Sequence, residues 1–372
     1  RTVQHWFGQT LDPHNGVTYG YNMVGVDPST NGSATIPVDI IPLNFNVGGQ
    51  SFIGSDVVPA ILASPQFQNG DYSLTSAAST VAGSKGPGGA LSAGNSGVQL
   101  EDATMRAQFN KVGTGYHLIL GTPVVHDAIT IDVPSQHGVI ATRNPARGVY
   151  FADVDVTWFA AQLQNLNNSL GYVDPTHLPL YVTNSVMLYF GRNPANCCII
   201  GFHGAGIVPG RSTGSVHGNG NQPVQTYAWT SYITPGTFNP ANSWAVQDIH
   251  ALSHEISEWA DDPFVNNTVE PWLTPTAPQY GCTGVLETGD PVVGIGFSKG
   301  ANTFEQGPTP TGVQVTDGTY HPEDEALLPW FMRSSPNTIS QPTQAASANV
   351  GRYTFMGDLN PFPGFRAPAT GC

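Results

Sequence analysis

The segment SWAVQDIHALSHEISEWA, residues 243–260, decides the expected fold because its apolar residues repeat at the spacing of a helix. These residues follow one another in alternating steps of four and three: Ala245, Ile249, Leu252, Ile256 and Trp259. Such a stripe is typical of a helix that lies with one face on a sheet. We therefore predict an amphipathic helix over residues 243–260, capped at its start by Asn242 or Ser243.

The polar residues of the same segment form a second stripe, turned away from the apolar one. At about 100° per residue, His250, His254 and Glu258 share a face of the helix. Residues four apart can hold one cation, so we expect His254 and Glu258 to be metal ligands and Glu255 to be the general base. The alternative is a solvated polar face. The clustering favours a site, because only 10% of the chain is charged.

A metal site of this kind needs a further protein ligand, and the segment GVLETGDP, residues 284–291, provides two carboxylates on a predicted turn. We predict His254, Glu258, Glu287 and Asp290 as metal ligands, with Glu255 as the catalytic residue. One nitrogen and several carboxylate oxygens suit zinc. Calcium or manganese is the alternative, because a glutamate replaces the second histidine of the H-E-x-x-H pattern.

The rest of the chain is rich in predicted strands and loops. Residues 34–45, 116–120, 128–133, 180–190 and 197–203 are apolar or alternating, and residues 156–170 predict a second helix. A glycine-rich loop is expected over residues 83–97. The pattern predicts an α+β fold, a zincin-like mixed sheet with an active-site helix. We expect one domain over 1–372, or two lobes: a sheet-rich part, 1–150, and a metal-site part, 151–372.

Composition narrows the class of protein. The formal net charge of -14 and the presence of only three lysines leave no basic patch, so we do not expect the protein to bind nucleic acid. There is no apolar run of about 18 residues, so no membrane span is expected. The low charge and the many small polar residues are typical of an extracellular protein. We expect a secreted protein whose signal peptide has been removed before Arg1.

The four cysteines are Cys197, Cys198, Cys282 and Cys372, an even number that predicts two disulfides in an oxidising compartment. A bridge between adjacent residues is sterically strained, so we expect Cys197 and Cys198 each to pair with one of the two distant cysteines. Buried free thiols are the alternative interpretation.

Three segments together resemble a known family: HEISEWADDPFVNNTVEPW (254–272), TAPQYGC (276–282) and LETGDP (286–291). They are similar to secreted, acidobacterial-type soil-bacterial proteins of uncharacterised function and, more distantly, to the plant EXORDIUM-like, phosphate-induced extracellular proteins. The bacterial resemblance extends to IPVDIIPL, SPQFQN, QLEDATMRAQF, YHLILGTP, CCIIGFHGA and YHPEDEALLPWF. It implies that His254, Glu255, Glu258, Glu287 and Asp290 form the polar centre, with His250 as an accessory residue. The resemblance does not indicate which reaction, if any, the protein catalyses.

Three other histidines are not expected to take part in the metal site. His203 and His217 lie in glycine-rich segments, where an exposed or backbone-bonded side chain is the first expectation. His321 precedes an acidic run, Pro322 to Glu325, which we interpret as the start of a helix. Trp330 and Phe331 are expected in the core.

The pattern as a whole predicts an extracellular, zinc-dependent, peptidase-like hydrolase. Its expected partner is a peptide or a component of the cell wall or matrix. The alternative is a non-catalytic secreted structural or cell-surface protein with a structural metal site, which self-associates into a filament or matrix. A glycan-binding wall protein is a third interpretation.

Overall fold

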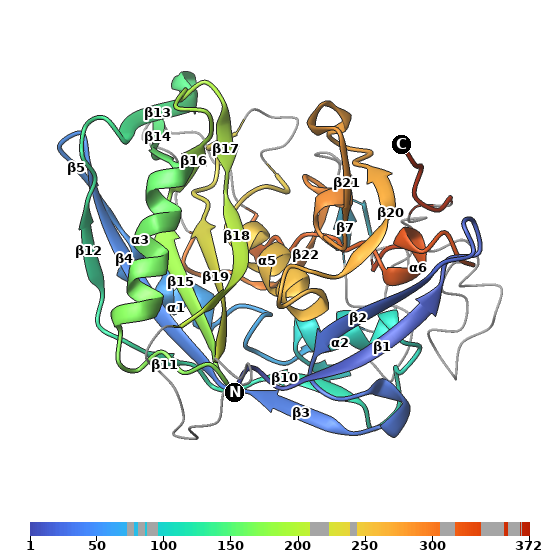
Figure 1. The fold of residues 1–372 in the computed structure, drawn as a ribbon. Helices are drawn as coiled ribbons and strands as arrows, with labels where there is room; N and C mark the ends of the chain where they lie inside the picture. The colour runs from blue at the N-terminus through green and yellow to red at the C-terminus, as the bar shows by residue number, and fades with distance from the viewer. Residues whose placement is uncertain are drawn as a thin grey trace.

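A seven-stranded mixed sheet lies at the centre of the computed structural model (Figure 1). Its strands are, in order, β11 (Val124–Val125), β4 (Val38–Val47), β15 (Leu178–Asn184), β19 (Val224–Tyr232) and β18 (Gly201–Ile207), while β12 (Ile129–Asp132) and β5 (Gln50–Ile53) also pair with β4. The strands β4, β15 and β19 run parallel, and β18 runs antiparallel to β19. The fold is mixed and strand-rich, which agrees with the predicted α+β class.

The structure describes residues 1–72, 78–80, 86–87, 96–208, 223–238, 244–305, 317–335, 353–355, 365 and 367–372. The predicted loop over 83–97 lies largely outside these residues, and so do His217 and the two predicted cap residues, Asn242 and Ser243.

Smaller sheets and short helices surround the central sheet. Their strands are β1 (His5–Leu11), β2 (Thr18–Val24), β3 (Ser33–Ile36), β6 (Gly70–Asp71), β7 (Ala78–Thr80), β8 (Gly86–Pro87), β9 (Ser96–Val98), β10 (His117–Leu120), β13 (Gly138–Asn144), β14 (Val149–Asp155), β16 (Val186–Tyr189), β17 (Cys197–Ile199), β20 (Thr268–Leu273), β21 (Cys282–Val285), β22 (Gly296–Ala301) and β23 (Thr319–Tyr320). Their helices are α1 (Val58–Leu62), α2 (Leu100–Gln108) and α6 (Leu328–Phe331). Within α6, Trp330 and Phe331 are buried, as predicted.

Helix α3 (Val156–Ser169) covers one face of the central sheet (Figure 1). It begins where predicted because the side chain of Asp155 accepts a hydrogen bond from the backbone N–H of Thr157, at 2.9 Å. Its buried residue Phe159 packs against Tyr181 of β15 and Trp229 of β19 in one apolar cluster. Neighbouring residues of these strands point to the opposite face, since side chains alternate along a strand.

Helix α5 (His250–Asp261) packs on that opposite face, against β19 and β18. Ile256 and Trp259 share an apolar cluster with Leu180 and Ala228 of the sheet. Trp259 also donates a hydrogen bond from its indole Nε1 to Thr226 Oγ1 of β19, at 3.0 Å. The apolar stripe predicted from the sequence therefore faces the sheet and fixes the rotation of the helix about its axis.

The start of α5 differs from the prediction. The helix begins at His250 and not at residue 243, because Asp248 forms an isolated β-bridge with Ile233 at the end of β19. Asp248 also adopts a positive φ of 42°, which is incompatible with a continuous helix. The stripe residues Ala245 and Ile249 are buried in spite of this, outside the helix proper.

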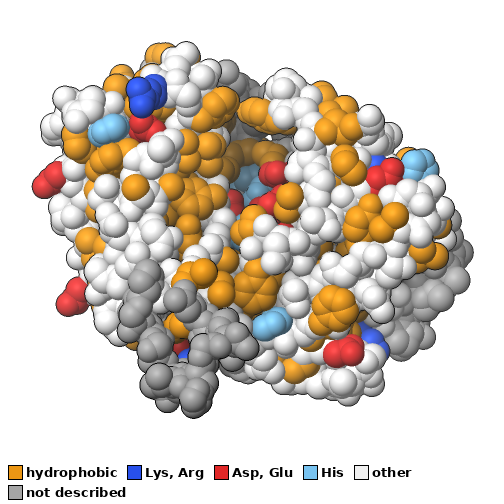
Figure 2. Space-filling model, viewed as in Figure 1, with side chains coloured by type: hydrophobic (Ala, Val, Ile, Leu, Met, Phe, Trp, Pro, Cys, Tyr) orange, Lys and Arg blue, Asp and Glu red, His pale blue; other side chains and the backbone are white. Residues whose placement is uncertain are grey.

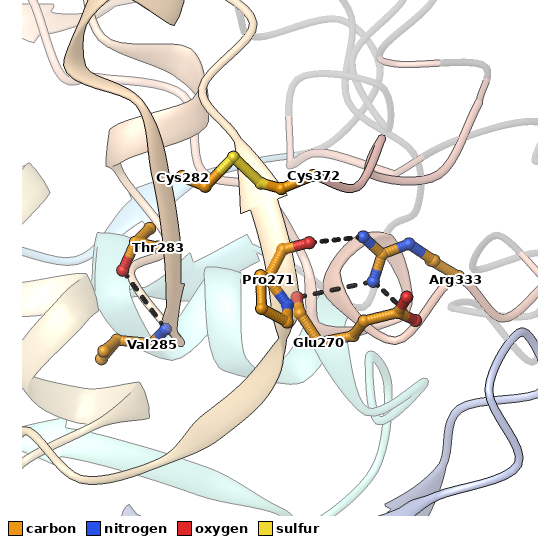
Figure 3. Close-up of a disulfide and its surroundings, with 7 residues drawn as sticks. All are labelled: Glu270, Pro271, Cys282, Thr283, Val285, Arg333 and Cys372. Atoms are coloured by element: carbon orange, nitrogen blue, oxygen red, sulfur yellow. Dashed lines mark hydrogen bonds and ion pairs between the residues drawn. A yellow bond between two sulfur atoms is a disulfide. The ribbon is translucent and has the colours of Figure 1, made fainter.

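The predicted cysteine pairing is wrong. The disulfides join Cys197 to Cys198 and Cys282 to Cys372. Cys197 and Cys198 lie in β17, which pairs with β16, while Cys282 begins β21, which pairs with β20. The topology thus separates the two adjacent cysteines from the other two. Figure 3 shows Cys282 and Cys372 beside Arg333, which donates to the backbone oxygen of Pro271 at 2.7 Å.

Within the described part of the chain, no helix is both long enough and apolar enough to cross a membrane.

Candidate metal centre

The polar stripe of α5 is buried, so the interpretation of it as a solvated helix face is wrong. Glu255 and Glu258 are 3% and 4% exposed, and His250 is completely buried. The side chains of Glu255 and Glu258 extend from α5 toward β18 and toward the segment that contains Glu287 and Asp290. Burying two acidic side chains together is costly unless cations or hydrogen bonds compensate the charge.

His254, Glu258 and Asp290 form the first group of candidate metal ligands, and His254 lies at its centre. Its Nε2 is 3.1 Å from Glu258 Oε1 and 3.6 Å from Asp290 Oδ1. Its other nitrogen, Nδ1, donates a hydrogen bond to Glu323 Oε1 at 2.7 Å. A histidine held by a carboxylate at one nitrogen, with the other directed at acidic groups, has the arrangement of a metal-binding histidine and its outer partner.

The segment after Glu287 is held against α5 by Glu258. Glu258 Oε1 accepts hydrogen bonds from the backbone N–H groups of Gly289 and Asp290, at 3.1 Å and 3.3 Å. Glycine is required at 289, because a Cβ atom there would collide with the ring of His254. These contacts bring Asp290 to His254, as the sequence predicts, although its side chain remains half-exposed.

His203, on β18, forms a second group that the sequence analysis had placed outside the site. Its Nδ1 lies 3.5 Å from Glu255 Oε2 and 3.6 Å from Glu258 Oε2. Its Nε2 donates to the backbone oxygen of Asp262 at 3.2 Å. The expectation of a backbone-bonded histidine is therefore confirmed, but this histidine also faces the acidic centre, and its side chain is 3% exposed.

The predicted ligands divide into two groups that share Glu258. Ligand atoms of His254, Glu258 and Asp290 all lie within 4.8 Å of one another, and so do those of His203, Glu258 and Glu287. The structure therefore brings all four predicted ligands together around α5, but Glu287 lies with His203 and not with His254.

Burial and mutual repulsion shift the pKa values of this centre. Burial, together with the Glu258 carboxylate, raises the pKa of Glu287 to about 9. Burial alone would lower the pKa of His203, but the Glu255, Glu287 and Glu258 carboxylates outweigh it and raise the pKa to about 10. Such protonated groups must lose their protons to solvent when a cation binds, so cation binding is expected to strengthen as the pH rises.

Glu323, which contacts two histidines, is not among the site residues predicted from the sequence. Besides His254, it contacts His250 Nε2 at 2.5 Å, and all three side chains are largely buried. The expected helix after His321 does not form. Residues 322–327 have no helical structure, and α6 begins only at Leu328. His321 instead pairs with Asp248 at 2.6 Å. The only available signal was the acidic run in the segment YHPEDEALLPWF.

The first group opens into a cleft of about 400 Å³. His254, Glu255, Asp290 and Glu323 line it on one side. The rest of the wall includes apolar side chains from several segments: Cys198, Ile199, Ile200, Phe238, Val246, Tyr280 and Val293. Figure 2 shows a hollow with histidine and acidic side chains at its base and hydrophobic side chains around it. Reactive groups at the base of a partly apolar cleft are typical of a ligand site.

A third acidic group, formed by Asp12, His14 and Glu270, lies away from this cleft. Arg333 Nη1 is 3.0 Å from Glu270 Oε2 and 3.8 Å from Asp12 Oδ2. A guanidinium charge therefore already compensates part of the negative charge of these carboxylates, which makes them poorer cation ligands.

Comparison of the chain with protein-family models, with curated proteins and with solved structures finds no match.

The donor set around α5 fits a divalent cation. Each group offers one histidine nitrogen and two carboxylate oxygens, a combination that zinc, manganese and calcium sites use in different proportions. Glu255 Oε2 is buried and accepts no hydrogen bond within the described part of the chain, so its remaining interactions are electrostatic.

Proposed function

We propose that the chain is a secreted, zinc-dependent, peptidase-like hydrolase in which His254, Glu258 and Asp290 hold the cation and Glu255 is the general base. The hydrogen bond between His254 and Glu323 is the observation that carries this proposal. An ordinary buried histidine needs no carboxylate behind it and two more in front of it, whereas a ligand histidine commonly has both. Manganese and calcium remain alternative cations for the same oxygen-rich set.

The cleft supports a hydrolase more than a closed structural site. His254 and Glu255 both line the cleft, so a substrate in it would reach the cation ligands and the base together. A divalent cation, when bound, supplies Lewis acidity toward a scissile carbonyl group. Glu255 would then take a proton from the attacking water and return it to the leaving amine.

The edge strand beside the helix supports a zincin-like arrangement and a peptide substrate. Among the described residues, strand β18 ends the central sheet, and its first residue, Gly201, lies against the side chain of Glu255. An extended peptide could pair with this edge through backbone hydrogen bonds while its side chains enter the cleft. The two disulfides agree with an oxidising, extracellular compartment.

The test is a Glu255→Gln variant, with Glu270→Gln as the matched control. Glu270 also pairs with a histidine, His14 at 3.0 Å, but lies outside the cleft. We expect Glu255→Gln to keep the metal content of the wild type and to lose at least about 100-fold in peptide hydrolysis, because the proton acceptor is gone. Glu270→Gln should hydrolyse peptides at the wild-type rate.

Two outcomes would count against the hydrolase. Wild-type turnover by Glu255→Gln would remove the general base from the proposal. A wild type that binds metal and melts at a lower temperature after chelation, yet cleaves no peptide in a broad library, would favour the structural, self-associating alternative.

A further inference from the structure

The carboxylate of Glu258 faces two different histidines with its two oxygens. Oε1 lies 3.1 Å from His254 Nε2, and Oε2 lies 3.6 Å from His203 Nδ1. A carboxylate placed in this way can bind one cation through each oxygen. The same side chain therefore belongs to both ligand groups.

His203 is oriented as a ligand in its own right. The hydrogen bond from Nε2 to the backbone oxygen of Asp262 fixes the proton on that nitrogen in the neutral ring. When the ring is neutral, the lone pair of Nδ1 points toward Glu255 and Glu258. His254 is arranged in the same manner, with Nδ1 held by Glu323 and Nε2 directed at Glu258 and Asp290.

Glu287 completes the second group, as Asp290 completes the first. It shares a group with His203 and Glu258, whereas Asp290 shares one with His254 and Glu258. Glu255 Oε2, which is buried and accepts no hydrogen bond within the described part of the chain, is directed at His203. A buried carboxylate oxygen in this position favours a positively charged partner, which a bound cation would supply in addition to His203.

The charges of the centre also call for more than one cation. The four carboxylates of Glu255, Glu258, Glu287 and Asp290 lie around two histidines. When all four are ionised, one divalent cation balances two of their negative charges, and the other two need protons or a second cation. A second divalent cation removes this excess.

We infer that His203, Glu258 and Glu287 form a second divalent-cation site, and that Glu258 bridges two cations in a dinuclear centre. The inference rests on the proposed metal centre and extends it. Dinuclear centres with a bridging carboxylate occur in aminopeptidases and phosphoesterases, where the paired cations stabilise both the attacking and the leaving oxygen atoms.

The experiment counts cations in the full chain. The protein is stripped of metal, dialysed against Zn²⁺, freed of excess ion and analysed for zinc per chain by elemental analysis and native mass spectrometry. We expect about two zinc ions in the wild type and about one in His203→Gln and in Glu287→Gln. His177→Gln is the matched control, because His177 pairs with Asp39 at 2.7 Å outside this centre, and it should keep both ions.

A second measurement needs no variant and so does not depend on the folding of one. Wild type loaded with Mn²⁺ should give the electron paramagnetic resonance signal of two exchange-coupled ions. An isolated-ion spectrum at saturating Mn²⁺, or one zinc per chain that His203→Gln leaves unchanged, would overturn the second site but not the proposed hydrolase. Absence of bound zinc from the wild type would reject both.

Discussion

Glu323 Oε1 lies 2.7 Å from His254 Nδ1, although 69 residues separate them in the sequence. The contact fixes the ring so that Nε2 faces Glu258 and Asp290. Glu323 also contacts His250, so one buried carboxylate holds the side chains of two histidines of α5. Burial opposes ionisation of Glu323, but the charges of His254 and His250 outweigh it and lower its pKa, which keeps this acceptor negative.

Replacing this partner should weaken metal binding without removing a ligand. We predict that Glu323→Gln lowers zinc affinity about 10–100-fold, the usual effect of losing an outer carboxylate. Competition with a chromophoric chelator would measure the change. Glu270→Gln, which alters a histidine–glutamate pair outside the cleft, should leave the affinity unchanged. Equal zinc affinities for wild type and Glu323→Gln would show that Glu323 does not support the metal.

Gly201 should be required for the position of the proposed base. A Cβ atom there would lie 2.6 Å from Glu255 Cγ and 2.7 Å from its Oε1, so Gly201→Ala must displace the carboxylate. We predict an approximately 10–100-fold loss of turnover with metal content retained. Gly171→Ala is the control, since nothing lies within 4 Å of its Cβ position. If Gly201→Ala were as active as Gly171→Ala, Glu255 would not need its present position.

The pH dependence of stability can be tested at Asp153 of β14, outside the metal centre. Burial raises the pKa of Asp153 to about 7, against the lowering effect of Arg143. The folded state therefore holds a proton between about pH 4 and pH 7 that the unfolded chain has lost, so stability decreases as the pH rises through this window. Asp153→Asn cannot titrate, and this contribution to the pH dependence disappears.

We predict that Asp153→Asn raises the free energy of unfolding by about 1–3 kcal/mol at pH 8 and leaves it nearly unchanged at pH 4. Urea denaturation at the two pH values measures the difference. A variant that is equally stabilised at both values would show that packing, and not ionisation, is responsible.

The two disulfides should differ in their contribution to stability. Cys282 and Cys372 are 90 residues apart, whereas Cys197 and Cys198 are adjacent. The entropy of the unfolded chain is reduced more by the longer loop, so replacing both Cys282 and Cys372 by serine should cost about 4 kcal/mol. The corresponding double variant at Cys197 and Cys198 should cost much less. Equal losses in denaturant titrations would contradict this ranking.

The sequence by itself determined the local features of the centre. The apolar stripe with Ile256 and Trp259 predicted which face of the helix packs on the sheet, because helical periodicity is a property of consecutive residues. The same periodicity placed His254 and Glu258 on one face, and their ligand atoms are 3.1 Å apart.

Only the tertiary structure decided what surrounds that face. His203 comes from an edge strand and Glu323 from a segment without regular structure, so no spacing along the chain relates either of them to His254. The same is true of the cysteines, whose pairing follows from which strands are neighbours. The start of α5 likewise depends on the bridge between Asp248 and Ile233.

The physical reason is the range of the interactions. Periodicity and capping act over a few residues and can be read from a single segment, whereas burial, charge neutralisation and strand pairing depend on residues that are distant in sequence and close in space. The sequence therefore predicts the helix and the residues on it that we propose as metal ligands. The packing of β18 and of the segment with Glu323 against α5 adds a second histidine and an outer carboxylate.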